Sequence, residues 1–487
     1  MCADRTSFPG ARWCRSVARL GAIRLLGTAS LGALTLIAGL GLAVAQTQLE
    51  PTADRPRVIR YISALPEHQG ESCYGLVRVE ANGIPVRVRA LSDRHPQLCY
   101  AGDPGHGQPQ LLRWAFAAAD AVTTAGAGTD TDEGLAEDLA QERLAELVLP
   151  PVEITGLELD ALQRFVIGVG LNYAEHREEV GGEEDETELL VFPKPVVPTG
   201  AYAPVRAGVQ IGELPVRPVL LLDYEVELGL VLLEDLDLRN PPGSYEAFID
   251  RVAFFTANDV SDREPIILDQ EAGYTRGKSH PTYLPIGPWM VHGRHLRPRT
   301  REEGEQSLEI GAVVSQLRPA DEPPVGEMPF GEERQLSTTD AMLRGPWAIV
   351  RHLSQTFRRG HIVCMRDANG HPRFIHDADG VIPAGSIILT GTPGGTAIRE
   401  PRLVEKAGLF VRGGLSVEGA RKAFIEDLEQ NIAGSPYLEV GDKVESWVES
   451  LGRQRWSVEA DAERRPYGID TSGACEPDSK PQPLVQP

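Results

Sequence analysis

The feature that most constrains the fold of this chain is a long apolar run that contains acidic residues. Residues 219–233 are rich in valine and leucine, which is typical of a buried strand. Residues two apart in a strand point to the same face, so Asp223, Glu225 and Glu227 are expected to share one face. Burying unpaired carboxylates is very costly. The run therefore predicts a positive partner for these acids, and a divalent metal ion is the natural candidate.

A further oxygen donor follows in residues 254–264, an apolar stretch that ends in a polar cluster. Its Asp259 would close a site with Glu225 and Glu227. Oxygen-only ligands favour hard cations such as Mg²⁺, Mn²⁺ or Ca²⁺ over zinc. The alternative interpretation is that the two glutamates face solvent on an edge strand or pair with arginines, since exposed alternating acids are common.

A candidate general base lies upstream of the acidic run. Residues 165–169 predict a strand that runs into a helix, with Asn172 as N-cap and Glu175 three residues on, as in a capping box. His176 and Glu179 would then lie on one helix face. A carboxylate beside an imidazole fixes its orientation and raises its basicity, which suits a general base. The alternative is a surface histidine on a charged helix.

Two downstream segments offer groups that could hold an anion. Lys278 would neutralise a substrate carboxylate, or it is an ordinary surface lysine. Residues 383–389 predict a strand that feeds a glycine-rich turn at 390–395. Main-chain amides in such a turn can approach an anion closely, although most glycine-rich turns are only turns.

Taken together and in order, eight segments resemble the fumarylacetoacetate hydrolase family. They are GLNYAEH, FPKP, DYEVELG, NDVSDRE, GKS, PIGPW, TGTPGG and GDKVE, and they follow the family's order across residues 165–450. The resemblance implies a fold that is mainly β with α/β elements. It implies a mixed β-sheet roll in the catalytic domain, preceded by a small β-rich amino-terminal domain.

The resemblance also implies a set of site residues. A Mg²⁺ ion, or Mn²⁺ or Ca²⁺ in its place, would be held by Glu225, Glu227 and Asp259. The His176–Glu179 pair would activate water or move a proton. The carboxylate or the developing enolate of the substrate would be held by Arg263, Lys278 and Thr392.

The chain departs from the family pattern near Arg263. The family often has Ala-Arg-Asp where this chain has Asp262, Arg263 and Glu264, and it often has glutamine where Ile266 stands. Without that polar contact, the family pattern does not identify the exact substrate. Residues 181–188 are strongly acidic and match a region that can act as a lid in the family.

The 487 residues exceed a usual single domain, so several segments are expected. They are a leader (1–45), a small amino-terminal domain with its linker (46–155), the catalytic domain (156–460) and a disordered tail (461–487). Strands are expected at 57–62 and 75–79, a helix at 135–148, and an inserted amphipathic helix at 416–431.

The leader is typical of an export signal. Its start carries five arginines, residues 25–45 carry no charge, and Ala43-Val44-Ala45 is a small-x-small cleavage pattern. The sequence therefore predicts an exported, periplasmic protein, with an uncleaved membrane anchor as the alternative. The formal net charge of −22 argues against nucleic acid and anionic membranes as partners.

The six cysteines include two in the leader, Cys2 and Cys14, which cleavage would remove. In an oxidising compartment Cys73 and Cys99 could form a disulfide, and buried free thiols are the equal alternative. The cysteine and histidine spacings do not suggest a zinc site.

The function expected is hydrolysis of a carbon–carbon bond in a small dicarbonyl or 2-keto acid compound resembling an acylpyruvate. Decarboxylation, hydration or tautomerisation of a 2-keto acid is the alternative, because stabilisation of an enolate by a metal ion serves those reactions as well. A periplasmic binding protein without turnover is the second alternative. By analogy with the family, a homodimer is also expected.

Overall fold

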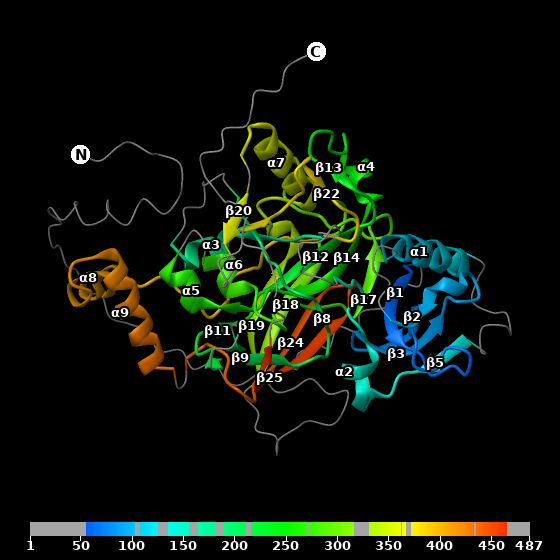
Figure 1. Cartoon of the computed structure of the whole chain (residues 1–487), viewed down its shortest axis with the longest axis horizontal. Coiled ribbons are helices and arrows are strands. Elements are labelled where there is room, and N and C mark those ends of the chain that lie inside the picture. Colours follow the sequence, from blue (N-terminus) through cyan, green and yellow to red (C-terminus); the bar gives the residue numbers. More distant parts are fainter. Residues whose placement is uncertain are drawn as a thin grey trace, which may run out of the picture. The chain divides into compact units, whose positions relative to one another are not determined.

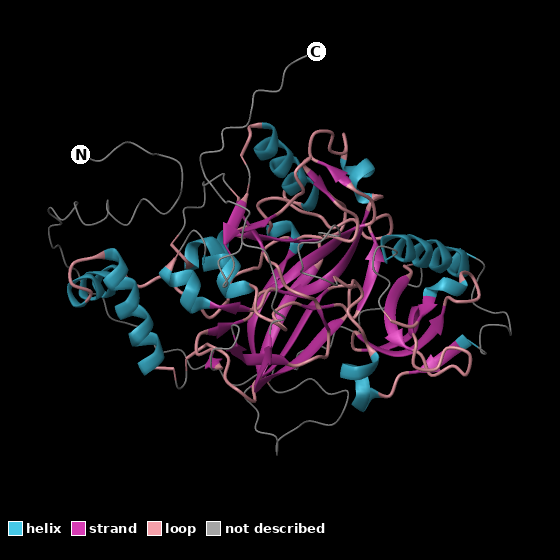
Figure 2. Ribbon diagram, viewed as in Figure 1, coloured by secondary structure: helices cyan, strands magenta, loops and turns pink. Residues whose placement is uncertain are grey.

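The computed structural model describes residues 55–102, 108–124, 135–154, 164–181, 189–210, 216–269, 273–315, 331–361, 363–366, 372–432 and 435–464. The described residues between Arg55 and Arg464 form one compact unit. Strands make up most of the described fold, with helices around them (Figure 2). The predicted leader, most of the acidic 181–188 segment and most of the predicted tail lie outside the described residues.

The largest sheet contains 13 strands among the described residues. Its long path runs in the order β5 (Ala136–Asp138), β3 (Ile84–Ala90), β2 (Ser72–Ala81), β1 (Arg57–Ile62), β17 (Trp289–His292), β14 (Val252–Asn258), β12 (Val226–Leu232), β23 (Ile387–Leu389), β6 (Val166–Gly170) and β7 (Leu190–Pro193). Beside this path lie β4 (Cys99–Tyr100), β8 (Thr199–Gly200) and β16 (Pro285–Ile286). Most pairs are antiparallel, but β23 pairs with β6 in parallel, so the predicted mixed, mainly β fold is confirmed.

A second sheet of the described chain has six strands, in the order β10 (Arg217–Pro218), β9 (Val205–Gln210), β25 (Arg453–Arg464), β24 (Lys443–Val448), β18 (Glu309–Ser315) and β19 (Glu332–Thr338). Three short ribbons complete the β structure of these residues. They pair β11 (Leu222–Asp223) with β15 (Ser261–Asp262), β13 (Leu236–Asp237) with β22 (Val381–Ile382), and β20 (Cys364–Arg366) with β21 (Pro372–Phe374).

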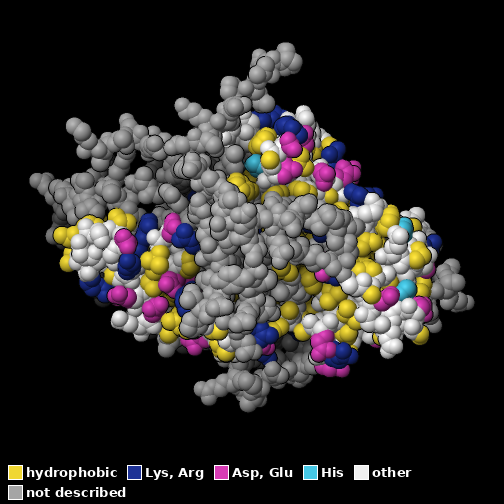
Figure 3. Space-filling view, viewed as in Figure 1, with side chains coloured by type: hydrophobic (Ala, Val, Ile, Leu, Met, Phe, Trp, Pro, Cys, Tyr) yellow, Lys and Arg dark blue, Asp and Glu magenta, His cyan; other side chains and the backbone are white. Residues whose placement is uncertain are grey.

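The helices are mostly short (Figure 1). They are α1 (Gln108–Thr124), α2 (Leu144–Leu147), α3 (Ala174–Glu179), α4 (Tyr245–Ile249), α5 (Arg263–Leu268), α6 (Gly273–Lys278), α7 (Pro346–Arg358), α8 (Leu403–Arg412) and α9 (Val417–Gln430), with 3₁₀ turns at Pro96–Leu98, Gln141–Arg143 and Thr339–Ala341. The inserted helix predicted at 416–431 is confirmed as α9, where the Ser416 hydroxyl caps the first turn. On the face seen in Figure 3, acidic and basic side chains are interspersed around α8 and α9.

The two central strands β12 and β14 are buried along their whole length. Their side chains alternate between two hydrophobic clusters, so Leu228 and Leu230 join one cluster and Val231 joins the other. A strand covered on both faces needs apolar residues at nearly every position, which explains the continuous run in the sequence. The carboxylate of Glu227 therefore emerges inside the protein and not on a solvated face.

The predicted single strand over 219–233 is wrong in its length. The structure breaks it into β11 and β12, which pair with different partners, β15 and β14. At the break the Glu225 amide donates to the Asn258 side chain, and the Glu225 carbonyl accepts from Asp259 N. These contacts interrupt the regular strand pairing at Glu225. Asp223 is therefore not part of the acidic cluster described below.

The predicted strands at 57–62 and 75–79 are confirmed as β1 and part of β2. β1 pairs with β2 on one side and with β17 on the other, so the amino-terminal strands continue the main sheet. The domain boundary expected near residue 155 stays a prediction. Cys73 and Cys99, which face each other across β2 and β4, form a disulfide bond.

The helix predicted at 135–148 is wrong. Residues 136–138 form β5, and a 3₁₀ turn and the short α2 follow. The Glu137 carboxylate accepts hydrogen bonds from the Tyr61 hydroxyl and the Ser63 hydroxyl, which fixes this segment as an edge strand. The tail boundary at 461 also changes, because β25 continues to Arg464.

Candidate functional site

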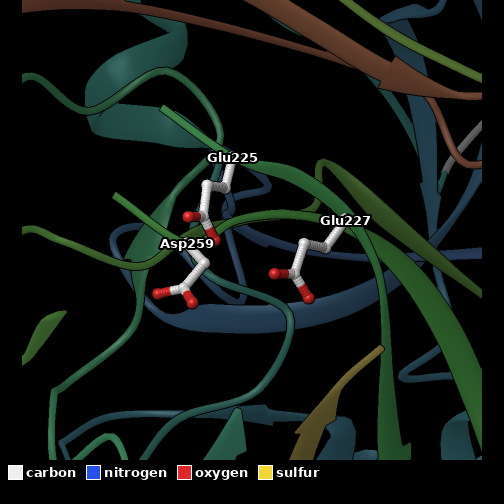
Figure 4. Close-up of side chains that lie close together, drawn as sticks. All are labelled: Glu225, Glu227 and Asp259. Atoms are coloured by element: carbon white, nitrogen blue, oxygen red, sulfur yellow. The ribbon is translucent and has the colours of Figure 1, made fainter. Parts of the chain in front are cut away.

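Three carboxylates meet where β12 begins and β14 ends. Glu225, Glu227 and Asp259 each offer an oxygen atom within 4.8 Å of the other two, and all three side chains are buried. Figure 4 shows the side chains lying close together. The antiparallel pairing of β12 with β14 places Glu227 opposite Ala257, close to Asp259, so the sheet itself assembles the cluster.

Cationic side chains contact the cluster directly, and two of them are at positions that the sequence singled out. The Lys278 ammonium, at the end of α6, donates to Glu225 Oε2 at 2.6 Å and to Asp259 Oδ2 at 2.7 Å. Arg263 Nη2, at the start of α5, lies 2.6 Å from Glu225 Oε1. Both cations are buried, so the interpretation of Lys278 as an ordinary surface lysine is wrong.

Lys194 is a further cation of the site that the sequence reasoning missed. Its ammonium is fully buried and lies 2.6 Å from Asp259 Oδ1. It also donates to the carbonyl oxygens of Val260 and Lys278. Lys194 belongs to the FPKP motif, but a single lysine beside prolines carries no spacing signal that would predict an internal ion pair.

The charges of the cluster shift the pKa values of its members in opposite directions. Burial would raise the pKa of Glu225, but Lys278, Arg263 and His176 lower it to about 2. Burial, together with Asp259 and Glu225, raises the pKa of Glu227 well above its usual range. Burial lowers the pKa of Lys194 to about 8, against the opposing charge of Asp259. A concentration of buried, perturbed acids and bases is typical of a functional site.

The glycine-rich turn after β23 binds carboxylates of the protein itself. The Gly391 amide donates to Glu227 Oε2 at 2.6 Å, and the Gly395 amide donates to Glu179 Oε1 at 2.7 Å. Both glycines have positive φ angles of 95° and 97°, which other residues rarely adopt. The sequence reasoning expected that such amides could meet an anion, and the anions in the structure are Glu227 and Glu179.

The predicted general base lies on α3, as a contact between His176 Nδ1 and Glu179 Oε2 of 3.4 Å. His176 is buried and is one of the groups that lower the pKa of Glu225, so it lies near the acidic cluster. The predicted cap of this helix is wrong, because Tyr173 is the N-cap. Asn172 instead uses its side chain to bind the main chain at Arg344 and Thr390, which holds the start of α3 against the turn.

Thr392 lies in the same turn, and its hydroxyl is engaged with the protein. It donates to the carbonyl of Val226 at 2.9 Å and accepts from the Gln335 side chain at 2.8 Å. Gln335 also accepts from the Val226 amide, so the turn is fastened to the start of β12. The predicted contact of Thr392 with substrate remains a prediction, and these bonds leave its hydroxyl proton committed to Val226.

The donor set suits a hard divalent cation. Glu225, Glu227 and Asp259 supply oxygen atoms only, which are the ligands that hard divalent cations prefer. Histidine and cysteine ligands, which would favour zinc, do not take part in this group of described residues. A Mg²⁺ or Mn²⁺ ion therefore fits the residues present.

Two of the curated relatives are similar to this chain over half of its length or more. A protein of Burkholderia multivorans, whose name assigns it provisionally to the hydrolases, is 29% identical over 262 residues, which cover 52% of this chain and 70% of that protein. An uncharacterized protein of Pyrococcus horikoshii is 25% identical over 298 residues, which cover 61% of this chain and 88% of that protein.

Among solved structures, the fumarylacetoacetate hydrolase of Exiguobacterium antarcticum is 19% identical, with a TM-score of 0.46, over 83% of this chain and all of that chain. None of the described helices is both long and apolar enough to cross a membrane. The family model described as fumarylacetoacetate hydrolase, C-terminal, matches residues 165–459. That segment is more than half of the chain and contains every residue of the site, so the protein belongs to the fumarylacetoacetate hydrolase family.

Proposed function

We propose that this protein is a metal-dependent hydrolase that cleaves a carbon–carbon bond in a small dicarbonyl or 2-keto acid compound resembling an acylpyruvate. The observation that carries the proposal is the buried cluster of Glu225, Glu227 and Asp259 beside the His176–Glu179 pair. The three carboxylates would hold Mg²⁺ or Mn²⁺, which would supply a positive charge that polarises a keto oxygen of the substrate.

His176 would act as the general base. Glu179 accepts from the Gly395 amide through one oxygen and faces His176 Nδ1 with the other. That arrangement favours a proton on Nδ1 and leaves Nε2 free to accept a proton from water. The Gly395 amide therefore fixes the orientation of the pair through Glu179.

The proposed reaction consumes one water molecule. Its oxygen bonds to the outer carbonyl carbon while His176 takes the proton, and the bond from that carbon to the neighbouring methylene then breaks. The electron pair passes to the 2-keto fragment, which takes up a proton and leaves as a second acid. Arg263 and Lys278 would hold the anionic groups and offset the charge that develops in the transition state.

Activity on a panel of acylpyruvates and on oxaloacetate, with Mg²⁺ and Mn²⁺ and product analysis, tests the proposal. Two acid fragments support hydrolysis, whereas released CO₂ would identify a decarboxylase. Retention of metal and ligand without turnover would favour a binding protein. Glu225→Gln and His176→Ala are expected to lose at least about a hundredfold in kcat. Full activity in either variant would exclude the mechanism.

The chain offers a matched control for the histidine variant. His68 contacts Glu71 at the same three-residue spacing, with an Nδ1–Oε2 distance of 2.8 Å, in the amino-terminal strand region. His68→Ala removes a similar pair away from the acidic cluster and is expected to keep wild-type kcat. The export and periplasmic location expected from the leader remain part of this proposal and are tested by fractionation of cells that express the full chain.

A further inference from the structure

Asp223 is the acidic residue of the original run that lies outside the three-carboxylate cluster. Its side chain is fully buried, at 0% exposed. Oδ1 accepts from the amides of Tyr224 at 2.8 Å and Ala397 at 2.9 Å, and Oδ2 accepts from the amide of Ile398 at 3.2 Å. These partners are main-chain groups, so the position of the carboxylate is fixed by Tyr224 and by the segment that directly follows the turn after β23.

The same carboxylate binds Arg263. Arg263 Nε donates to Asp223 Oδ2 at 2.8 Å, and Nη2 lies 2.7 Å from the same oxygen. Because the guanidinium group is planar, two contacts made by different nitrogens fix its plane as well as its position. Asp223 therefore transmits the geometry of the turn to an arginine at the edge of the acidic cluster.

Arg263 is shared between two acids with different roles. Its Nη2 atom lies 2.6 Å from Glu225 Oε1, which belongs to the group that fits a metal ion. If Asp223 lost its charge, the attraction of the guanidinium would fall on Glu225 alone. Arg263 would then move toward Glu225 and compete with a metal ion for its oxygen.

We propose that Asp223 is a positioning residue that holds the Arg263 guanidinium in the place and plane needed to receive an anionic substrate group. Because Asp223 takes part of the attraction of the Arg263 guanidinium, it also keeps the Glu225 oxygen available to a metal ion at the acidic cluster. This inference rests on the proposed function, because that function assigns Arg263 to the substrate anion.

Asp223→Asn separates the two contacts of the side chain. An asparagine carbonyl can still accept from the Ala397 amide, but its NH₂ group would face the N–H groups of Arg263. The Tyr224 and Ala397 contacts are kept, while the Ile398 amide loses its acceptor and the arginine loses its anion. Asp262→Asn is the control, because Asp262 is equally buried on the neighbouring strand but its carboxylate contacts Arg217 and His280 and caps α5 at the Glu264 amide, a cap that asparagine can keep.

The measurement is calorimetric binding of oxalate to the full-length protein with saturating Mg²⁺, together with Mg²⁺ affinity and thermal unfolding. Oxalate is a small planar dianion that resembles a 2-keto acid enolate. Asp223→Asn is expected to bind oxalate at least about tenfold more weakly, and Asp262→Asn within about threefold of wild type. Arg263→Lys is expected to lose about as much as Asp223→Asn, because one ammonium cannot reproduce the two-nitrogen contact.

The double variant Asp223→Asn/Arg263→Lys tests whether the two residues act together. The proposal expects it to bind oxalate no more weakly than the weaker single variant, since both changes remove the same placement. A loss equal to the product of the two single losses would show independent action and would overturn the proposal. Wild-type oxalate affinity in a folded Asp223→Asn protein would overturn it as well.

The test also covers a variant that does not fold and a wild-type protein that does not bind the probes. If Asp223→Asn does not fold, Arg263→Lys decides, and wild-type oxalate affinity in that variant would overturn the positioning role. If the wild-type protein binds neither Mg²⁺ nor oxalate, the proposed function fails and this inference fails with it. Oxalate binding by the wild type, with unchanged affinity in Asp223→Asn and weaker binding in Arg263→Lys, removes the role of Asp223 alone.

Discussion

The acidic cluster has two sides that hold carboxylates by different means. On one side, the ammonium groups of Lys194 and Lys278 contact Asp259, and Lys278 also reaches Glu225. On the other side, the main-chain amides of the turn after β23 hold Glu227 and Glu179. Amides are fixed in the backbone and neutral, whereas long cationic side chains carry full charge and can move.

The two kinds of contact have different effects on the carboxylates of the site. Amide contacts fix the orientation of Glu227 and Glu179 without offsetting a full charge. Ammonium contacts offset the charge of Asp259 and Glu225, and a divalent cation could take over that role. We therefore expect metal to compensate for damage on the cationic side and not for damage on the amide side.

The largest effect is expected from Lys194→Met, which removes the ammonium and leaves Asp259 with less positive charge in a buried site. Loss of one partner of a buried pair costs about 3–5 kcal/mol in the free energy of unfolding. Denaturant titration measures this loss, and Mg²⁺ should restore more stability to the variant than it adds to the wild type. Equal increments in both proteins would contradict the exchange of lysine for metal.

Lys422→Met is the control for that experiment. Lys422 contacts Glu418 on the exposed face of α9, where the pair is solvated. An exposed pair of this spacing contributes about 0.3–0.5 kcal/mol. The variant should therefore unfold like the wild type with and without Mg²⁺.

The Glu225→Gln/Glu227→Gln double variant removes one acid held mainly by cations and one held by an amide. Calorimetry should show at least about a hundredfold weaker Mg²⁺ binding, equal to about 2.7 kcal/mol. Glu234→Gln, at an exposed acid just after β12, is the control and should leave Mg²⁺ affinity unchanged. Unchanged affinity in the double variant would mean that the cluster is structural.

Gly391→Ala tests the amide side. Gly391 has a φ of 95°, and a Cβ atom there would lie 2.8 Å from the Cβ of Asn172. The strain should cost about 2 kcal/mol of stability and displace the amide that holds Glu227. Mg²⁺ should not recover this loss beyond its effect on the wild type, because an added charge does not relieve backbone strain. A full recovery would remove the distinction between the two sides.

The smallest effect concerns a buried base that lies among positive neighbours. Burial, with Arg294 and His295, lowers the pKa of His292 to about 3, and Nδ1 accepts from the Arg294 amide. The folded state therefore disfavours protonated His292, so its contribution to stability is full above pH 6.5 and is lost as the pH falls toward 3. The loss between pH 6.5 and pH 5 should be about 1.5 kcal/mol.

His292→Gln should remove this part of the acid dependence. The measurement is the difference in unfolding free energy between variant and wild type across that pH range, which cancels the other titrating groups. A difference that does not change with pH would show that His292 is already protonated or solvated in the folded protein. Lys194, which is also buried but faces Asp259, is the contrasting case.

The sequence predicted the parts of this fold and site that local patterns encode. β1 and β6 follow from apolar runs, and the meeting of Glu225 with Asp259 follows from motif order. The long-range contacts could not be predicted in this way, because no periodicity links Asp223 to residues near 397. Lys194 was missed for the same reason: an internal ammonium is defined by what surrounds it in space.

The helix α1 shows a different limit. Its buried positions, Leu111, Leu112, Ala115, Phe116, Ala119 and Val122, have helical spacing, but the sequence reasoning did not predict it and placed a helix at 135–148 instead. The long-range hydrogen bonds of Glu137 override the helical preference of that later segment. Tertiary contacts overrode the local secondary-structure propensity in that segment, and they did the same at the break between β11 and β12.

The pairing of β1 with β17 limits how the catalytic segment can be prepared by itself. Arg57, Val58 and Ile59 lie opposite Val291, Met290 and Trp289 in an antiparallel ladder. A fragment that begins at residue 156 would turn β17 into an open sheet edge and uncover Trp289, which is 1% exposed in the full fold. Such edges recruit strands from other molecules. We expect that fragment to aggregate, and a chain that begins near residue 54 to stay monodisperse.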